Sequence, residues 1–160
     1  MLSAPAPGPL PTRQVVPPVT ARTADGKTIR AWDYKQKNPL VITFVHADCR
    51  YCDSWLEQLA ARRADLIDRE AVALVIYAEA PPRSTERLMD PMIAACDVTG
   101  HSQRAFLGPE AFGPAGLNRV GVFVTDRYGE LFGQWLGRDA AELPPLREIL
   151  SMLSAIQTIC

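Results

Sequence analysis

The sequence predicts one α/β domain, built on a central mixed β-sheet with helices on both faces. Two apolar, β-branched segments, residues 40–45 and 71–77, are typical of strands that are covered on both sides. The segment between them has apolar residues at helical spacing, so residues 40–77 are expected to form a strand-helix-strand unit with parallel strands. Residues 120–135 have the pattern of a β-hairpin, which adds antiparallel pairing. The 160 residues suffice for one domain of this kind and not for two.

The N-terminal segment differs in composition from the rest of the chain. Residues 1–19 hold six of the fourteen prolines, and such a segment neither continues a helix nor pairs inside a sheet. We expect an extended arm over residues 1–19, which lies on the domain or reaches a partner, and the domain itself over residues 20–160. The domain should begin with a hairpin, because an Asp-Gly turn signal at 25–26 lies between short extended segments at 19–23 and 28–32.

Helices are predicted from the spacing of apolar residues. Their expected ranges are residues 53–67, 84–96 and 143–156. The Gly- and Pro-rich segment 100–118 is expected to be irregular, apart from a short strand near residues 105–107.

Charge argues against a nucleic-acid partner, and hydropathy argues against a membrane-spanning segment. Seventeen basic residues nearly balance eighteen acidic ones, and no run of Lys or Arg is long enough to follow a phosphate backbone, so we expect no nucleic-acid partner. The longest apolar run, residues 39–45, is far shorter than the ~20 residues that span a bilayer, so we expect no membrane span. The N-terminus has neither the basic nor the apolar region of a secretory signal, which predicts a cytoplasmic location.

The four cysteines include one closely spaced pair, Cys49 and Cys52, where the strand at 40–45 gives way to the first helix. Unpaired backbone N–H groups and the positive end of the helix dipole stabilise a thiolate at a helix N-terminus. Cys49 is therefore expected to be the nucleophile of thiol-disulfide exchange, and Cys52, one turn later, the resolving thiol. A zinc site is an alternative, but it would call for a second pair of ligands, and Cys96 and Cys160 are isolated. We expect Cys96 to be a small core residue on the second helix.

Neighbouring side chains are expected to tune the Cys49 thiolate. Arg50 favours the thiolate and Asp48 disfavours it, so the two charges partly offset each other. His46 either caps the end of the strand, tunes the thiolate, or ligates a metal beside the cysteine pair.

Several short motifs occur in one consistent order over about residues 20–158. They are Asp25-Gly26-Lys27, Asp33-Tyr34-Lys35, Leu40 to Val45, Ala47-x-Cys49-x-x-Cys52 and Val122-Phe123-Val124-Thr125-Asp126-x-x-Gly129. In these motifs the chain resembles the thioredoxin-like superfamily, and especially its redoxin or peroxiredoxin-like branch of the AhpC/TSA type. The resemblance implies a thioredoxin-like fold and thiol-disulfide oxidoreductase chemistry.

The sequence departs from the thioredoxin pattern around the cysteine pair. Thioredoxins have a cis-proline before the strand of the late hairpin; the matching position is Val120, preceded by Arg119, and the resemblance implies that both contact substrate. Asp48 replaces the aromatic residue that precedes the first cysteine. Thr43 replaces a buried acid, and its hydroxyl can form hydrogen bonds but cannot titrate. Proton handling is therefore expected to differ from that of thioredoxins.

Two other branches of the superfamily match less well. Peroxiredoxins have a proline and a Thr or Ser upstream of the reactive cysteine, where this chain has Ile42 and His46, so a peroxidase of the usual kind is not expected. Tyr51 resembles the tyrosine of the glutaredoxin Cys-Pro-Tyr-Cys motif, and a role beside the cysteines is implied for it. Arg50 stands in place of the proline of that motif.

Two functions from different classes are consistent with these residues. The first is a thiol-disulfide oxidoreductase that exchanges the Cys49/Cys52 pair with a protein partner. The alternative is a non-catalytic interaction subunit of a larger assembly, which the departures from the thioredoxin pattern and the proline-rich arm favour. A third interpretation is metal handling by Cys49, Cys52 and His46. We predict no cofactor and no resident metal.

Overall fold

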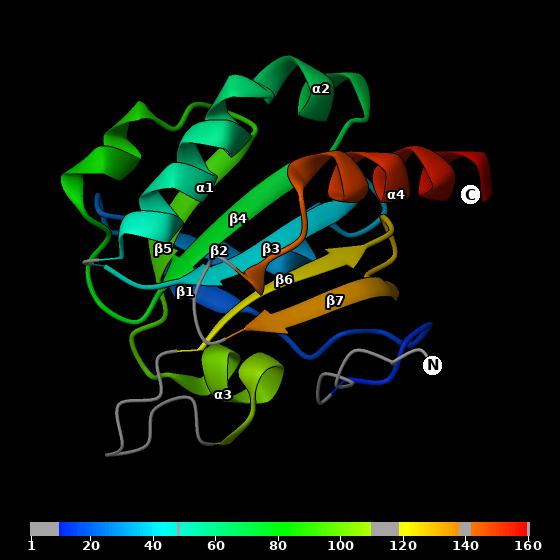
Figure 1. The fold of residues 1–160 in the computed structure, drawn as a ribbon. Coiled ribbons are helices and arrows are strands. Elements are labelled where there is room, and N and C mark those ends of the chain that lie inside the picture. The colour runs from blue at the N-terminus through cyan, green and yellow to red at the C-terminus, as the bar shows by residue number, and fades with distance from the viewer. Residues whose placement is uncertain (1–9, 48, 110–118, 138–141, 160) are drawn as a thin grey trace.

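The computed structural model describes residues 10–47, 49–109, 119–137 and 142–159. Its strands form one mixed sheet in the order β2-β1-β5-β4-β3-β6-β7 (Figure 1). The strands are β1 (Thr20–Arg22), β2 (Thr28–Arg30), β3 (Leu40–Val45), β4 (Val72–Tyr77), β5 (Met92–Cys96), β6 (Val120–Thr125) and β7 (Leu131–Gly137). The α-helices are α1 (Arg50–Ala61), α2 (Arg63–Asp68), α3 (His101–Leu107) and α4 (Leu146–Ile159), and two short 3₁₀ helices are η1 (Ala31–Tyr34) and η2 (Arg83–Arg87).

The predicted strand-helix-strand unit is confirmed and lies at the centre of the sheet. β3 and β4 pair in parallel, from Leu40 opposite Val72 to Val45 opposite Tyr77, and every residue of both strands is buried. A parallel pair needs a crossover connection, which α1 and α2 provide. β6 pairs antiparallel with the other edge of β3. The strand that leads to Cys49 is therefore held rigidly between two neighbours.

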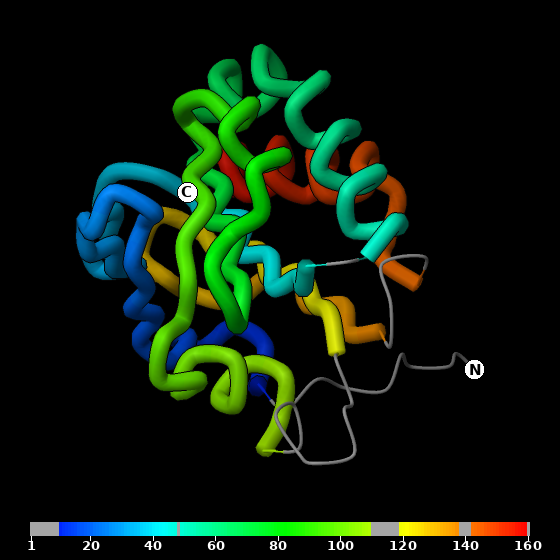
Figure 2. Tube along the Cα trace, turned by 90° about the vertical axis from the view of Figure 1, so that its left-hand side faces the viewer, coloured from blue at the N-terminus to red at the C-terminus, as the bar shows by residue number. Residues whose placement is uncertain are grey.

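Helices cover both faces of the sheet, as predicted. α1, α2 and α4 lie on one face and α3 lies on the other (Figures 1 and 2). On the α3 face, the rings of Phe44, Phe106 and Phe123 pack with centroids between 4.9 and 5.9 Å apart, distances at which aromatic rings attract one another. In the described part of the chain, none of these helices is long and apolar enough to span a membrane.

The two predicted hairpins are both present. β1 and β2 pair antiparallel around the Asp-Gly turn, from Thr20 opposite Arg30 to Arg22 opposite Thr28. β6 and β7 form the late hairpin, in which Val120 lies opposite Gly137.

Part of the proline-rich segment lies against the turn of the late hairpin. The backbone N–H of Arg13 donates to the carbonyl of Leu131 at 2.6 Å, and the N–H of Val16 donates to the carbonyl of Gly129 at 2.9 Å. The N–H of Leu131 in turn donates to the carbonyl of Gln14 at 2.9 Å. Residues 13–16 are thus attached to the sheet by main-chain hydrogen bonds.

The predicted helix over residues 84–96 is wrong in its second half. Residues 92–96 form β5, which pairs in parallel with β4 from Ala73 opposite Met92 to Tyr77 opposite Cys96, and only residues 83–87 are helical. A short apolar run satisfies a helical and an extended pattern equally well. The extended form prevails because it pairs the N–H and C=O groups along the free edge of β4.

Other boundaries also differ from those predicted. The expectation of an irregular segment with a short strand near residues 105–107 is wrong for residues 101–107. They form α3, whose Phe106 packs against the sheet. The buried carboxylate of Asp97 accepts the N–H of Gln103 at 2.9 Å and so satisfies a donor in the first turn of that helix. The first helix begins earlier, at Arg50, and is interrupted at Arg62.

Candidate active site

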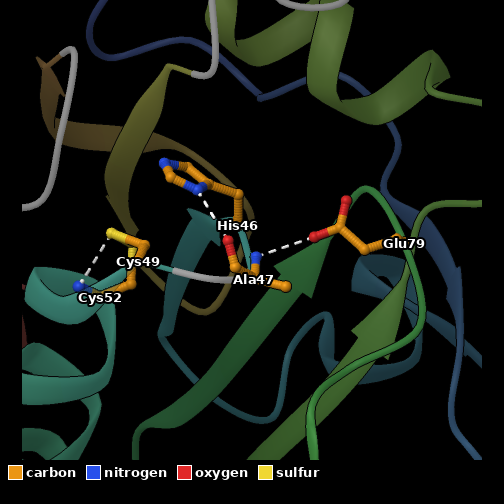
Figure 3. Close-up of a disulfide and its surroundings, with 5 residues drawn as sticks. All are labelled: His46, Ala47, Cys49, Cys52 and Glu79. Atoms are coloured by element: carbon orange, nitrogen blue, oxygen red, sulfur yellow. Dashed lines mark hydrogen bonds between the residues drawn. A yellow bond between two sulfur atoms is a disulfide. The ribbon is translucent and has the colours of Figure 1, made fainter.

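The cysteine pair lies where β3 gives way to α1 (Figure 3). Cys49 is the N-cap residue of α1, and its sulfur accepts the backbone N–H of Cys52 at 3.1 Å. The two Cα atoms are 5.1 Å apart, and the sulfurs are joined in a disulfide. The predicted juxtaposition of the pair with a helix N-terminus is therefore present.

The two cysteines differ in accessibility. Cys49 is 8% exposed, whereas Cys52 is completely buried among the apolar side chains beneath α1. Tyr51, between them, is 55% exposed, and Arg50 is also exposed. A partner that approaches from solvent therefore reaches the sulfur of Cys49 and the side chains of the two intervening residues before it reaches Cys52.

The structure brings His46 next to the pair. One nitrogen of its half-buried ring and the two cysteine sulfurs lie within 4.8 Å of one another. Nδ1 of the ring lies 3.1 Å from the carbonyl oxygen of Ala47, and because a carbonyl only accepts, Nδ1 carries the proton. The imidazole thus presents Nε2 as its basic nitrogen.

Glu79 supports this segment and was not among the predicted site residues. Its Oε1 accepts the backbone N–H of Ala47 at 2.8 Å (Figure 3). Glu79 follows β4 by two residues, and the carboxyl ends of the parallel strands β3 and β4 lie at one edge of the sheet. A search for polar residues just after each predicted strand could have found it.

The remaining predicted site residues occupy different surroundings. Val120 is buried in the same apolar cluster as Cys49 and Cys52, at the first residue of β6. Arg119 directs Nη1 to the carbonyl of Leu107 at 3.3 Å, which ties β6 to the end of α3. Asp48 lies outside the described residues, as does Cys160.

Three buried polar groups lie on the α1 side of the sheet. Thr43 Oγ1, Trp55 Nε1 and Tyr77 OH have no hydrogen-bond partner in the part of the chain that the structure describes. Burial raises the pKa of the Tyr77 hydroxyl well above its ordinary value, with smaller contributions from the charges of Asp53 and Glu79. The Tyr77 hydroxyl is therefore neutral throughout the physiological pH range. The other hydroxyl of this group, on Thr43, occupies the position of the buried acid of thioredoxins and does not titrate.

Thr43→Val is expected to stabilise the protein by about 1–2 kcal/mol. Valine has nearly the same shape as threonine, and the substitution removes a buried hydroxyl that lacks a hydrogen-bond partner among the described residues. Thr125 is an equally buried control, whose Oγ1 donates to the carbonyl of Asp126 at 2.9 Å. Thr125→Val should destabilise by about 1 kcal/mol. Urea unfolding of the two variants tests this, and equal losses of stability in both would show that Thr43 has a partner such as a bound water.

The prediction that Cys96 lies on a helix is wrong, because this residue ends β5. It is half-buried, and its sulfur lies 3.6 Å from the carbonyl oxygen of Ala78. Burial raises the pKa of this thiol, and the charges of Asp97 and Glu79 add to the effect. Cys96 is therefore protonated at neutral pH and is a poor nucleophile.

A comparison with protein-family models assigns most of the chain to a known family. The model of the AhpC/TSA family matches residues 12–131, a range that includes the cysteine pair. Among curated protein sequences, none matches this one significantly.

Solved structures similar to this one include peroxiredoxins and a disulfide interchange protein. The reduced 2-Cys peroxiredoxin of Plasmodium vivax superposes with a TM-score of 0.72 at 15% identity, over 94% of this chain and 83% of that chain. The mitochondrial 2-Cys peroxiredoxin of Plasmodium falciparum gives 0.70 at 12% identity, over 92% and 95%. A Chlorobium tepidum chain described as thiol:disulfide interchange protein DsbE gives 0.64 at 17% identity, over 90% and 99%. These similarities confirm the thioredoxin-like fold.

Proposed function

Since the chain belongs to the AhpC/TSA family, we propose that it is a thiol-disulfide oxidoreductase that exchanges the Cys49–Cys52 pair with a protein partner. The observation that carries the proposal is the disulfide at the N-terminus of α1, with one accessible sulfur and one buried sulfur. Membership of a redoxin family and this pair together support thiol-disulfide redox chemistry.

The reaction transfers two electrons between the pair and a partner disulfide. In the reducing direction, the Cys49 thiolate attacks one partner sulfur, forming a mixed disulfide and expelling the other partner sulfur as a thiolate. The Cys52 thiolate then attacks the sulfur of Cys49, which closes the internal disulfide and expels the second partner thiolate. The dithiol is thereby oxidised and the partner disulfide reduced to two thiols. The reverse sequence oxidises a partner dithiol.

The structure supports this division of roles. The N–H of Cys52 at 3.1 Å and the N-terminus of α1 stabilise negative charge on Cys49. Cys52 is inaccessible to a partner, but its sulfur reaches that of Cys49 without any change of fold. The exposure of Arg50 and Tyr51 supports a role for both in contacting the partner around the attacked sulfur.

The alternative, an interaction subunit, also has a structural observation in its favour. An apolar cavity of about 340 Å³ lies between the proline-rich segment, η1 and the β6–β7 turn. Its lining includes the exposed side chains of Val15, Trp32 and Tyr128. Leu40, at the start of β3, also lines it, so the cavity lies at the opposite end of that strand from the cysteine pair.

The reduction potential of the pair tests the proposed function. We expect a value between about −120 and −270 mV, the range of proteins that exchange disulfides, when the full chain is equilibrated with glutathione or dithiothreitol buffers. A potential below about −300 mV would identify a structural disulfide and contradict the proposal. Cys96→Ala is the control, because this residue lies outside the pair and should leave the potential unchanged.

A further inference from the structure

Three side chains with metal-ligating atoms converge at the end of β3: His46, Cys49 and Cys52. We propose that the reduced protein binds one Zn²⁺ ion through the two sulfurs and Nε2 of His46, with water in the fourth position. This site uses the cysteines of the exchange reaction but does not depend on that reaction. The sequence predicts no resident metal but leaves open metal handling by these three residues, and the imidazole supplies a third protein ligand without a second cysteine pair.

The spacing of the three ligand atoms suits a tetrahedral ion. One ring nitrogen of His46 and the two cysteine sulfurs lie within 4.8 Å of one another. With Zn–S bonds of about 2.3 Å and Zn–N bonds of about 2.0 Å, ligand atoms of a tetrahedral site are about 3.5–3.8 Å apart. Reduction frees the two sulfurs to separate to this distance, and side-chain rotations that move the ligand atoms by about 1 Å complete the site.

The orientation of His46 is that of a zinc ligand. Its Nδ1–H donates to the carbonyl of Ala47 at 3.1 Å, which leaves the lone pair of Nε2 for an ion. A metal-bound histidine commonly donates its other N–H to a backbone carbonyl in this way. The N–H of Ala47 is itself held by Glu79 at 2.8 Å. The supporting hydrogen bonds of the proposed ligand are therefore formed in the absence of the ion.

Charge and donor type select the ion. Two thiolates neutralise a dication, so the complex can occupy a site in which Cys52 is fully buried and Cys49 is 8% exposed without a large cost of burying net charge. Sulfur and imidazole donors suit Zn²⁺, whereas Mg²⁺ and Ca²⁺ require oxygen donors. Binding displaces the two thiol protons to solvent. The N–H of Cys52 lies 3.1 Å from the sulfur of Cys49 and further stabilises that thiolate.

Metal titration of the reduced, metal-stripped full chain tests the proposal. We expect one equivalent of Zn²⁺ to bind in competition with a chromophoric chelator, and Co²⁺, used as a spectroscopic probe, to give thiolate charge-transfer bands. His46→Gln should weaken Zn²⁺ binding at least about tenfold. The matched control is His101→Gln, because His101 is exposed at the start of α3 and is the other histidine of the chain. It should bind Zn²⁺ like the original protein.

Two results would overturn the proposal. One is the absence of stoichiometric Zn²⁺ binding by the reduced protein; the other is equal affinity in His46→Gln and His101→Gln. Circular dichroism of each variant shows whether it is folded, and the charge-transfer bands of its Co²⁺ form report sulfur ligation independently of affinity. Disulfide exchange is measured on the same metal-free samples, so failure of zinc binding with intact exchange would reject this inference alone.

Discussion

Replacing Cys49 by serine is expected to lower the rate of disulfide exchange by about 10³-fold or more, equivalent to at least about 4 kcal/mol of activation free energy. Cys49 is the accessible member of the pair and the N-cap of α1, where the thiolate is stabilised. A serine hydroxyl remains protonated there and does not attack a disulfide. The rate is measured as reduction of a model protein disulfide by the pre-reduced full chain.

Cys96→Ala is the control for this experiment. Burial and two nearby carboxylates raise the pKa of the Cys96 thiol, so at neutral pH a smaller fraction of it is thiolate than in a free cysteine. Its removal should leave the exchange rate unchanged. Retention of activity in Cys49→Ser, or loss of activity in Cys96→Ala, would contradict the assignment of Cys49 as nucleophile.

The parts of the fold that the sequence predicts well are those with a long, unambiguous pattern. The continuous apolar segments that form β3 and β4 can be fully buried only in the middle of a sheet that is covered on both faces, and this is where they lie. β5 was not predicted, because its five residues satisfy two periodicities and the free edge of β4 decides between them. α3 was not predicted for a similar reason, since the packing of Phe106 against Phe44 and Phe123 is a long-range contact.

The candidate site was predictable to the extent that it is local in sequence. His46, Cys49 and Cys52 lie within seven consecutive residues, so the strand-to-helix junction alone brings them together. Glu79 comes from the end of the neighbouring strand, and its contact with Ala47 depends on the register of β3 and β4. The direction of the Arg119 side chain, toward the end of α3, depends on the position of a helix that the sequence did not predict.

Removal of the resolving thiol should stop the reaction at its first intermediate. With Cys52→Ser, the Cys49 thiolate can still attack an external disulfide, but nothing within the protein attacks the mixed disulfide that results. Oxidised glutathione should therefore give a stable adduct at Cys49, whereas the original protein proceeds to its internal disulfide and carries no glutathione on either cysteine of the pair. Mass spectrometry of the intact protein and of its peptides measures both the stoichiometry and the site.

The reciprocal variant decides which cysteine attacks. Cys52 is completely buried, so in Cys49→Ser it should form an adduct with glutathione far more slowly than Cys49 does in Cys52→Ser. Because a serine hydroxyl at a buried position is costly by about 1–3 kcal/mol, Cys52→Ala provides a second test that leaves only a small apolar cavity. Faster adduct formation at Cys52 than at Cys49 in these variants would reverse the two roles, and adduct formation at neither would show that the pair does not take part in exchange.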